Sequence, residues 1–154
     1  MRLSTKAQYA VRALVDLSLH SGGKPVSLRE ISEREEIPQS YLEQLFLRLK
    51  NGRIIASVRG PGGGYILARN SAEISVGDIV SSVEEPLDPV SCLDEKSPCS
   101  RGGRCVTRNV WKGLGERIRG FLDSINLEDL TREARAGSGA PDQPYEKPSW
   151  IRHG

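Results

Sequence analysis

A run of glycine and proline limits the folds open to this chain more than any other stretch. Residues 60–64 are only Gly and Pro, and they separate two short apolar or β-branched segments, 56–58 and 65–67. This arrangement predicts a β-hairpin. Glycine has no Cβ and tolerates positive φ, so the hairpin can press its backbone against a neighbour. A nucleotide-binding loop is disfavoured, because the run opens no helix and lacks the lysine and hydroxyl of a P-loop.

Three helices are expected before this hairpin. Apolar residues at helical spacing predict helices over 3–19, 28–36 and 38–50. Ser27 and Glu30 fit a capping box at the start of the second, and the proline at position 38 ends it. Helix, turn, helix and then a hairpin is the layout of a winged helix-turn-helix. We therefore expect a mainly α fold with a small β-wing and a long C-terminal dimerisation helix.

The third helix and the hairpin supply candidate DNA-binding residues. An apolar stripe on the third helix leaves polar side chains near its N-terminus, where a recognition helix reaches base edges in the major groove. Arg59 lies at the hairpin tip, where it can enter a minor groove or contact phosphate. An ordinary solvated helix face and a simple tight hairpin are the alternatives. The candidates are Gln39, Ser40, Tyr41, Glu43, Gln44, Arg59 and Gly60.

The charge distribution agrees with a phosphate-facing N-terminal half. Residues 1–70 hold 11 Lys/Arg against 6 Asp/Glu, and residues 71–154 hold 11 against 14. The sequence contains no run of ~18 apolar residues, so we expect no membrane-spanning helix. An apolar segment typical of a signal peptide is also missing after Met1. With three cysteines, an odd number, we expect a reduced, cytoplasmic protein with no membrane partner.

The second half of the chain predicts a dimerisation arm. Ala72 to Pro86 is expected to form one helix, 87–105 a cysteine-containing loop, 106–135 a long dimerisation helix with a short terminal helix, and 136–154 a disordered tail. Residues 1–86 would then be the DNA-binding domain. A long helix with a broad apolar stripe needs a partner surface, although core packing is the alternative. The stripe is Trp111, Leu114, Ile118, Phe121, Leu122 and Ile125.

The three cysteines are clustered between the DNA-binding domain and the long helix. They are Cys92, Cys99 and Cys105, and this spacing is unlike the paired C-x2-C knuckles of structural zinc sites. Thiolates bind soft metals and iron–sulfur clusters, which usually take four protein ligands. An iron–sulfur cluster, a zinc site, a thiol switch and inert cysteines all remain open on the residues alone.

Taken together, the chain resembles the IscR-like iron–sulfur cluster regulators of the Rrf2-type winged helix-turn-helix transcription factor family. The likeness covers about residues 1–130. Its matching segments are MRL at 1–3, YAV at 9–11, ISER at 31–34, SYLEQLF at 40–46, SVRGPGGGY at 57–65, the three-cysteine loop, and a helix with Trp111 that ends in GFL at 120–122.

The resemblance implies a function and a ligand set. It implies a cytoplasmic homodimer on palindromic, double-stranded promoter DNA, with Ser40, Glu43 and Gln44 in the major groove and Arg59 in the minor groove. It also implies that Cys92, Cys99 and Cys105 ligate a cluster whose presence, loss or oxidation changes promoter choice. We expect a 2Fe–2S cluster. A 4Fe–4S cluster stays open as the alternative, because three cysteines do not determine the cluster type.

Two departures from the family pattern concern the fourth ligand. Arg108 stands where family members place a histidine, and arginine stays protonated. Some relatives use a carboxylate from the first helix of the other subunit, and the matching residue is Gln8. The first cysteine gap is also one residue longer than in the regulators that the chain resembles. Asp94, Glu95, a residue of the partner chain or a small exogenous ligand could fill the position, while His20 and His153 lie far away in sequence and are expected to be surface residues rather than ligands.

Two functional hypotheses follow. The first is a dimeric, sequence-specific transcriptional regulator that senses cluster, iron, redox or nitric oxide status. The alternative is an iron–sulfur or thiol redox protein that uses the winged fold only as a scaffold, without specific DNA binding. We expect no enzyme and no catalytic residues, since the chain shows neither a Ser/His/Asp arrangement nor paired carboxylates in a plausible pocket.

Overall fold

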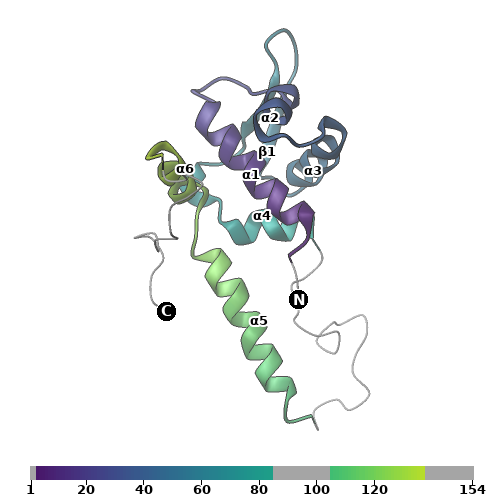
Figure 1. Cartoon of the computed structure of the whole chain (residues 1–154), viewed down its shortest axis with the longest axis vertical. Helices are drawn as coiled ribbons and strands as arrows, with labels where there is room; N and C mark the ends of the chain where they lie inside the picture. The colour runs from purple at the N-terminus through teal and green to yellow at the C-terminus, as the bar shows by residue number, and fades with distance from the viewer. Residues whose placement is uncertain (1–2, 85–104, 138–154) are drawn as a thin grey trace.

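The computed structural model of the chain describes residues 3–84 and 105–137. In this part of the chain the fold is mostly helical with one small antiparallel sheet, which confirms the predicted fold class (Figure 1). In chain order the elements are α1 Thr5–His20, α2 Leu28–Glu35, α3 Gln39–Asn51, β1 Ile55–Val58, β2 Gly64–Leu67, the 3₁₀ turn η1 Ser71–Glu73, α4 Val76–Val83, α5 Arg108–Asp123 and α6 Leu127–Arg135. Most of the predicted tail (its residues 138–154) and most of the cysteine loop lie outside the described residues.

Helix α1 lies at the centre of the folded domain (Figure 1). Its inward side carries three small residues, Ala7, Ala10 and Ala13, all buried. Small side chains let neighbouring helices approach closely, and α1 contacts α2, α3, α4 and α6. The largest side chains buried around α1 are Phe46, Leu14, Leu17, Ile31, Ile37, Leu42, Leu49, Ile54, Ile55, Ile74, Ile79 and Leu127.

The predicted capping box at the start of α2 is present. The Glu30 backbone N–H donates to Ser27 Oγ at 3.2 Å, and the Ser27 backbone N–H donates to the Glu30 carboxylate at 2.8 Å. The Glu30 carboxylate also accepts a hydrogen bond from the Ser27 hydroxyl at 3.0 Å, and the two hydrogen bonds that this carboxylate accepts from Ser27 lower the pKa of Glu30. The stability that they add is present above the ordinary carboxyl pKa and is lost as the pH falls through the lowered one.

The prediction of one helix from Ala72 to Pro86 is wrong in its first turn. Residues Ser71–Glu73 form a 3₁₀ turn, and α4 begins only at Val76. Ser75 caps α4, because its hydroxyl accepts the Asp78 backbone N–H at 2.9 Å while the Asp78 carboxylate accepts the Ser75 N–H at 3.0 Å. Apolar spacing continues across this break, so periodicity alone does not reveal it.

The wing is attached to the rest of the domain by a third extended segment. Strands β1 and β2 pair with Ile55 opposite Leu67 and Val58 opposite Gly64. Beyond them, Val26 and Tyr65 exchange two backbone hydrogen bonds, at 3.0 and 2.8 Å. A Cβ on Gly64 would overlap the Val26 carbonyl, so glycine is needed for this close approach. The wing is therefore fixed to the segment that leads into α2.

Helix α5 projects away from the domain, and the chain then returns (Figure 1). The end of α5 packs on α4, where a Cβ on Gly77 would overlap the Asp123 carboxylate. Helix α6 then packs against α1. The assignment of Ile125 to the dimer face needs correction. It follows the end of α5 and is only 6% exposed, because it lies in the domain core.

A buried ion pair joins α1 to α2. The Asp16 side chain is 2% exposed and accepts hydrogen bonds from Arg34 Nε at 2.9 Å and Nη2 at 2.8 Å. The hydrogen bond to Asp16 raises the pKa of Arg34. His20 Nδ1 lies 3.5 Å from the same carboxylate. Removing the guanidinium would leave a buried carboxylate without its strongest partner.

We expect Arg34→Ala to lower the free energy of unfolding by ~2–4 kcal/mol, somewhat less than for a fully buried pair because Arg34 is partly exposed. Urea unfolding measures the difference. The control is Arg29→Ala on the same helix, whose pair with Glu33 is largely exposed and should contribute ~0–0.5 kcal/mol. Equal effects of the two substitutions would contradict a structural role for the Asp16 pair.

Candidate nucleic-acid interface

The turn between α2 and α3 sets the direction of the third helix. Glu36 adopts a left-handed conformation with φ 55°, which ends α2. The Ser32 hydroxyl donates to the Ile37 carbonyl at 2.6 Å and closes the turn. Pro38 then occupies the N-cap of α3 without a side-chain hydrogen bond. The start of α3 therefore has no side-chain cap, which leaves its first backbone N–H groups available to an anionic partner.

Helix α3 has one buried and one exposed side. The buried side carries Leu42, Leu45, Phe46 and Leu49, as the sequence predicts. The predicted DNA-contacting residues Gln39, Ser40, Glu43 and Gln44 are all exposed, whereas Tyr41 is half-buried. Tyr41 packs edge-on against Tyr9 of α1, with ring centroids 5.6 Å apart. Tyr41 therefore helps to place the start of α3.

The exposed side of α3 also carries a residue that the sequence pattern does not single out. Leu47 is 61% exposed, although leucine is usually buried. A signal for it is present in the sequence, because it follows Ser40, Glu43 and Gln44 at helical spacing.

The wing and α3 are held in a fixed relation to each other. The Phe46 ring on α3 meets the Tyr65 ring on β2 edge-on, with centroids 5.0 Å apart. The Ile54 backbone N–H donates to the Leu49 carbonyl at 3.0 Å, which joins the end of α3 to the start of β1. Arg59 and Gly60 follow β1 and are exposed at the wing turn, closed by a 2.9 Å hydrogen bond from the Gly63 N–H to the Gly60 carbonyl. One rigid unit therefore presents both the polar helix face and an exposed arginine.

Contacts at the end of α4 join it to α3 and to the N-terminus of α1, just before the part of the sequence that carries the first two cysteines. Arg48 Nη1 on α3 donates to the Val83 carbonyl at 2.9 Å, and the Ser4 backbone N–H donates to the Glu84 carboxylate at 2.9 Å. Cys92 and Cys99 lie outside the described residues. Cys105 is half-exposed just before α5, and its Sγ lies 3.1 Å from Thr107 Oγ1. Arg108 is the first residue of α5.

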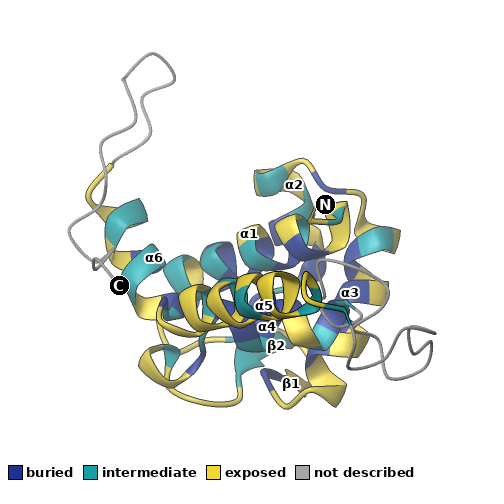
Figure 2. Ribbon diagram, turned by 90° about the horizontal axis from the view of Figure 1, so that it is seen from below, coloured by how far each residue is buried: buried dark blue, intermediate teal, exposed yellow. Residues whose placement is uncertain are grey.

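Helix α5 is mostly exposed (Figure 2). Gly115 is its only buried residue. Trp111, Leu114 and Phe121 are 38%, 40% and 48% exposed, while Ile118 and Leu122 are half-buried. Leu122 also packs against the domain core. Helix α5 is therefore amphipathic, and its apolar stripe is largely without a partner in the described part of the chain.

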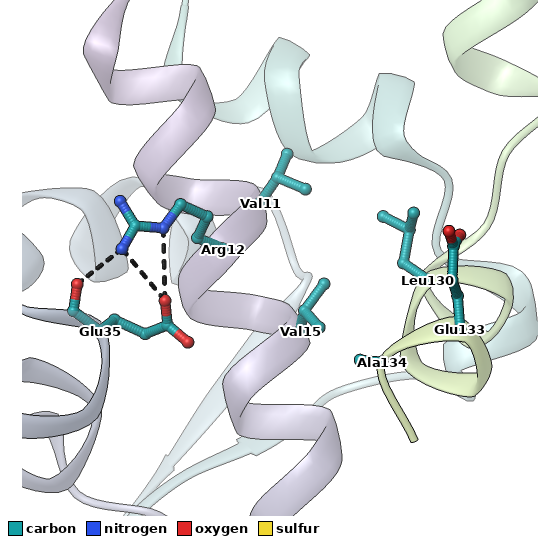
Figure 3. A pocket seen from close by; sticks show the side chains of 7 residues that line it. All are labelled: Val11, Arg12, Val15, Glu35, Leu130, Glu133 and Ala134. Carbon is teal, nitrogen blue, oxygen red and sulfur yellow. Dashed lines mark hydrogen bonds and ion pairs between the residues drawn. The ribbon is translucent and has the colours of Figure 1, made fainter. Parts of the chain in front are cut away.

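A pocket of about 380 Å³ lies elsewhere, between α1, the end of α2 and α6 (Figure 3). Its lining residues are Val11, Arg12, Val15, Glu35, Leu130, Glu133 and Ala134. Arg12 is engaged with Glu35, since its Nη2 donates to the Glu35 carbonyl at 2.6 Å and to the carboxylate at 3.2 Å. Because no residue of α3 or the wing lines this pocket, it is separate from the candidate nucleic-acid interface.

Two kinds of site find no support in the described residues. Within 3–84 and 105–137, no three His, Cys, Asp or Glu side chains come together as metal ligands. None of the helices described is long and apolar enough to cross a membrane.

Comparison with known proteins agrees with this geometry. Residues 3–133 match the Rrf2 family, described as an iron-dependent transcriptional regulator. The HTH-type transcriptional regulator IscR of Serratia proteamaculans is 50% identical over 130 residues, which cover 84% of this chain and 79% of the relative. IscR of Xenorhabdus nematophila is 46% identical over 147 residues, covering 96% and 89%.

Solved structures show the same fold. T. potens IscR superposes with a TM-score of 0.72 at 38% identity, covering 90% of this chain and 91% of that chain. CymR, the global cysteine regulator of B. subtilis, superposes with a TM-score of 0.70 at 32% identity, covering 86% and 97%. The likeness therefore extends over the winged domain and α5 together.

Proposed function

The chain belongs to the Rrf2 family of transcriptional regulators, and on this basis we propose that it is a cytoplasmic homodimer whose iron–sulfur cluster alters promoter choice. Like its relatives, it is a DNA-binding transcriptional regulator and not an enzyme. The observation that carries the proposal is the position of α5. Its first turn follows Cys105, its exposed stripe offers a dimer surface, and its last turn packs on α4 of the winged domain.

In the proposed complex, α3 enters the major groove and the wing reaches the adjacent backbone or minor groove. Ser40 and Gln44 offer hydrogen-bonding side chains to base edges, and Gln39 lies at the helix start. Glu43 accepts a hydrogen bond from a cytosine amino group and repels sites that lack one. Gly60 lets the wing backbone approach the duplex, since its φ of 103° suits glycine and its Cβ side is open space.

We expect Arg59→Ala to weaken operator binding about tenfold and to reduce the salt slope of the binding constant by about one for each protomer that loses a phosphate contact. Fluorescence anisotropy at several salt concentrations measures both. The matched control is Arg135→Ala on α6, which removes the same charge from the end of the helix that packs on α1. A variant with wild-type affinity and salt slope would remove Arg59 from the interface.

The proposed cluster ligands are Cys92, Cys99 and Cys105. The donor chemistry fits, because thiolates are the usual ligands of iron–sulfur clusters. Cys105 fits in position as well, since its thiol is half-exposed and lies just before α5, whose N-terminal end favours an anionic group. When bound, the cluster supplies a redox-active and labile group. We favour a 2Fe–2S type, with 4Fe–4S as the alternative.

The fourth ligand is not among the residues that the family pattern would supply. Arg108 begins α5, and its guanidinium has no lone pair to offer. Gln8 is exposed on α1, and its amide donates to the Leu3 carbonyl at 3.2 Å. Neither residue is a ligand typical of iron–sulfur clusters, so we propose that the fourth ligand comes from the 85–104 segment, the partner chain or an exogenous molecule.

The contacts at the end of α4 support a route from the cysteine segment to the DNA-binding face. Glu84 immediately precedes the segment with Cys92 and Cys99, and it is held by the N-terminus of α1. The neighbouring Val83 is held by Arg48 on α3. A change in this segment therefore bears on the position of α3, on which half-site matching by a dimer depends.

An absorption and Mössbauer spectrum of protein purified without oxygen, with iron and sulfide assayed per chain, tests the cluster directly. The proposal predicts bound iron and sulfide with a charge-transfer band in the visible. A colourless protein that resists reconstitution and still binds DNA would leave a transcriptional regulator without a cluster. Specific DNA binding by neither form would instead favour the alternative of a redox protein built on a winged scaffold.

A further inference from the structure

The exposed leucine on α3 lies on the same side of the helix as the residues proposed to contact DNA. Leu47 follows Ser40 by seven residues, Glu43 by four and Gln44 by three. Residues at these intervals share one face of a helix, so Leu47 extends the same stripe by one further turn. It lies on the side of α3 opposite the buried residues Leu42, Leu45 and Leu49, and it is 61% exposed.

The fold itself does not account for Leu47. The core beneath α3 is filled by other side chains, and Leu47 is not among the residues packed against it. Single exposed leucines are common on protein surfaces and need no explanation. This one differs in its position, because recognition helices of the homeodomain type contact bases through residues at i, i+3, i+4 and i+7. Ser40, Glu43, Gln44 and Leu47 have this spacing.

The chemistry of the side chain then indicates what it contacts. A leucine can neither donate nor accept a hydrogen bond, so it cannot read guanine, cytosine or adenine through their polar groups. Thymine is the base that presents an apolar group, its C5-methyl, in the major groove. Burying a methyl group against leucine removes apolar surface of both partners from water, which favours binding.

We propose that Leu47 is a specificity-determining residue that contacts the C5-methyl group of a thymine in each half-site. The inference rests on the proposed placement of α3 in the major groove, and it adds an apolar contact to the polar ones of Ser40, Glu43 and Gln44. The operator should therefore hold a thymine at one fixed position of each half-site, and replacing it by any other base should lower the affinity of the protein.

Uracil in place of thymine tests this contact, because it removes only the methyl group and keeps base pairing. An operator is first selected from random duplexes with the wild-type protein. Each thymine pair of the two half-sites is then replaced by deoxyuridine, and affinity is measured by anisotropy at fixed salt. At one symmetric position we expect the wild type to lose about threefold to fivefold per half-site, as for one buried methyl group.

The variant Leu47→Ala completes a double-mutant cycle. It should bind the thymine operator more weakly by a similar factor, and should bind the thymine and deoxyuridine duplexes equally at that position. Alanine is the better helix former, so α3 should remain folded, which urea unfolding checks. Gln44→Ala on the same face is the matched control. It should weaken binding to both duplexes, because a polar contact is lost, but it should keep the wild-type ratio of the affinities for the thymine and deoxyuridine duplexes.

The outcomes separate this inference from the proposed function. Wild type that binds its operator specifically but ignores every deoxyuridine substitution overturns the role of Leu47 alone. That role is equally overturned if Leu47→Ala keeps the full sensitivity to deoxyuridine, or if the selected half-sites contain no thymine. A wild-type protein with no sequence preference in any cluster state would overturn the DNA-reading role of α3 itself.

Discussion

Leu114→Asp should leave the chain monomeric and lower its affinity for a palindromic operator by about 100-fold or more. Leu114 lies in the middle of the exposed apolar stripe of α5, between Trp111 and Phe121. A carboxylate buried in an apolar interface without a partner costs several kcal/mol, and a symmetric dimer would bury two of them. Once the dimer is lost, the second half-site no longer adds its factor of about 10²–10⁴ to the avidity.

Light scattering after gel filtration and anisotropy with the operator measure the two effects. The charge-matched control is Asn109→Asp, on the exposed side of α5 away from the apolar stripe, which should change neither. Trp111 fluorescence gives an independent reading of whether the stripe becomes covered on dimerisation. A Leu114→Asp protein that remains dimeric at micromolar concentration would contradict the proposed dimer surface.

Cys105→Ala should reduce the iron and sulfide content of anaerobically purified protein to near zero and abolish the visible absorption band. A cluster that keeps two of its three cysteine ligands is expected to be lost during purification. The fold should be unaffected, because Cys105 is half-exposed and lies outside the buried core, where substitutions usually change stability by less than ~0.5 kcal/mol.

A second substitution at the same place separates ligation from local packing. Thr107→Val keeps the size of the residue whose hydroxyl lies 3.1 Å from Cys105 Sγ, and it should retain the cluster. Cys105→Ala should still bind DNA, with the preferences of the cluster-free protein. Wild-type iron content in Cys105→Ala would exclude this residue as a ligand.

Features that depend on neighbouring residues could be predicted from the sequence. The Gly-Pro run indicated the hairpin because few other structures accommodate it, and the predicted strands differ by one residue from β1 and β2. Apolar spacing indicated α3 with its buried residues Leu42, Leu45, Phe46 and Leu49. The box formed by Ser27 and Glu30 marked the start of α2.

Features that depend on residues far apart in the chain could not be predicted from the sequence. The bridge between Val26 and Tyr65 and the ion pair between Asp16 and Arg34 join segments far apart in the chain, and no local pattern announces them. Ile125 shares the apolar spacing of α5 but is drawn into the domain core, where its carbonyl accepts the Val76 backbone N–H at 2.8 Å. Spacing therefore identified an apolar residue without revealing which surface it covers.

The candidate site shows the same division. Helical spacing placed Ser40, Glu43 and Gln44 on one exposed face, and the structure confirms that exposure. Leu47 is not predicted as a site residue because leucine is usually buried; its spacing after Ser40, Glu43 and Gln44 was a signal, and the packing of α3 confirms that it is exposed. The contacts of Arg48 with Val83 and of Ser4 with Glu84 are long-range and likewise needed the structure.

The proposed function depends above all on the cluster changing which promoters the dimer binds. The experiment that addresses this point is parallel selection from a random duplex library with anaerobic, cluster-loaded protein and with Cys105→Ala, followed by affinities for each selected class with both proteins. We expect two classes of site that the two forms rank differently, with both forms dimeric. The same ranking and the same affinities for both forms would show that the cluster does not set promoter choice.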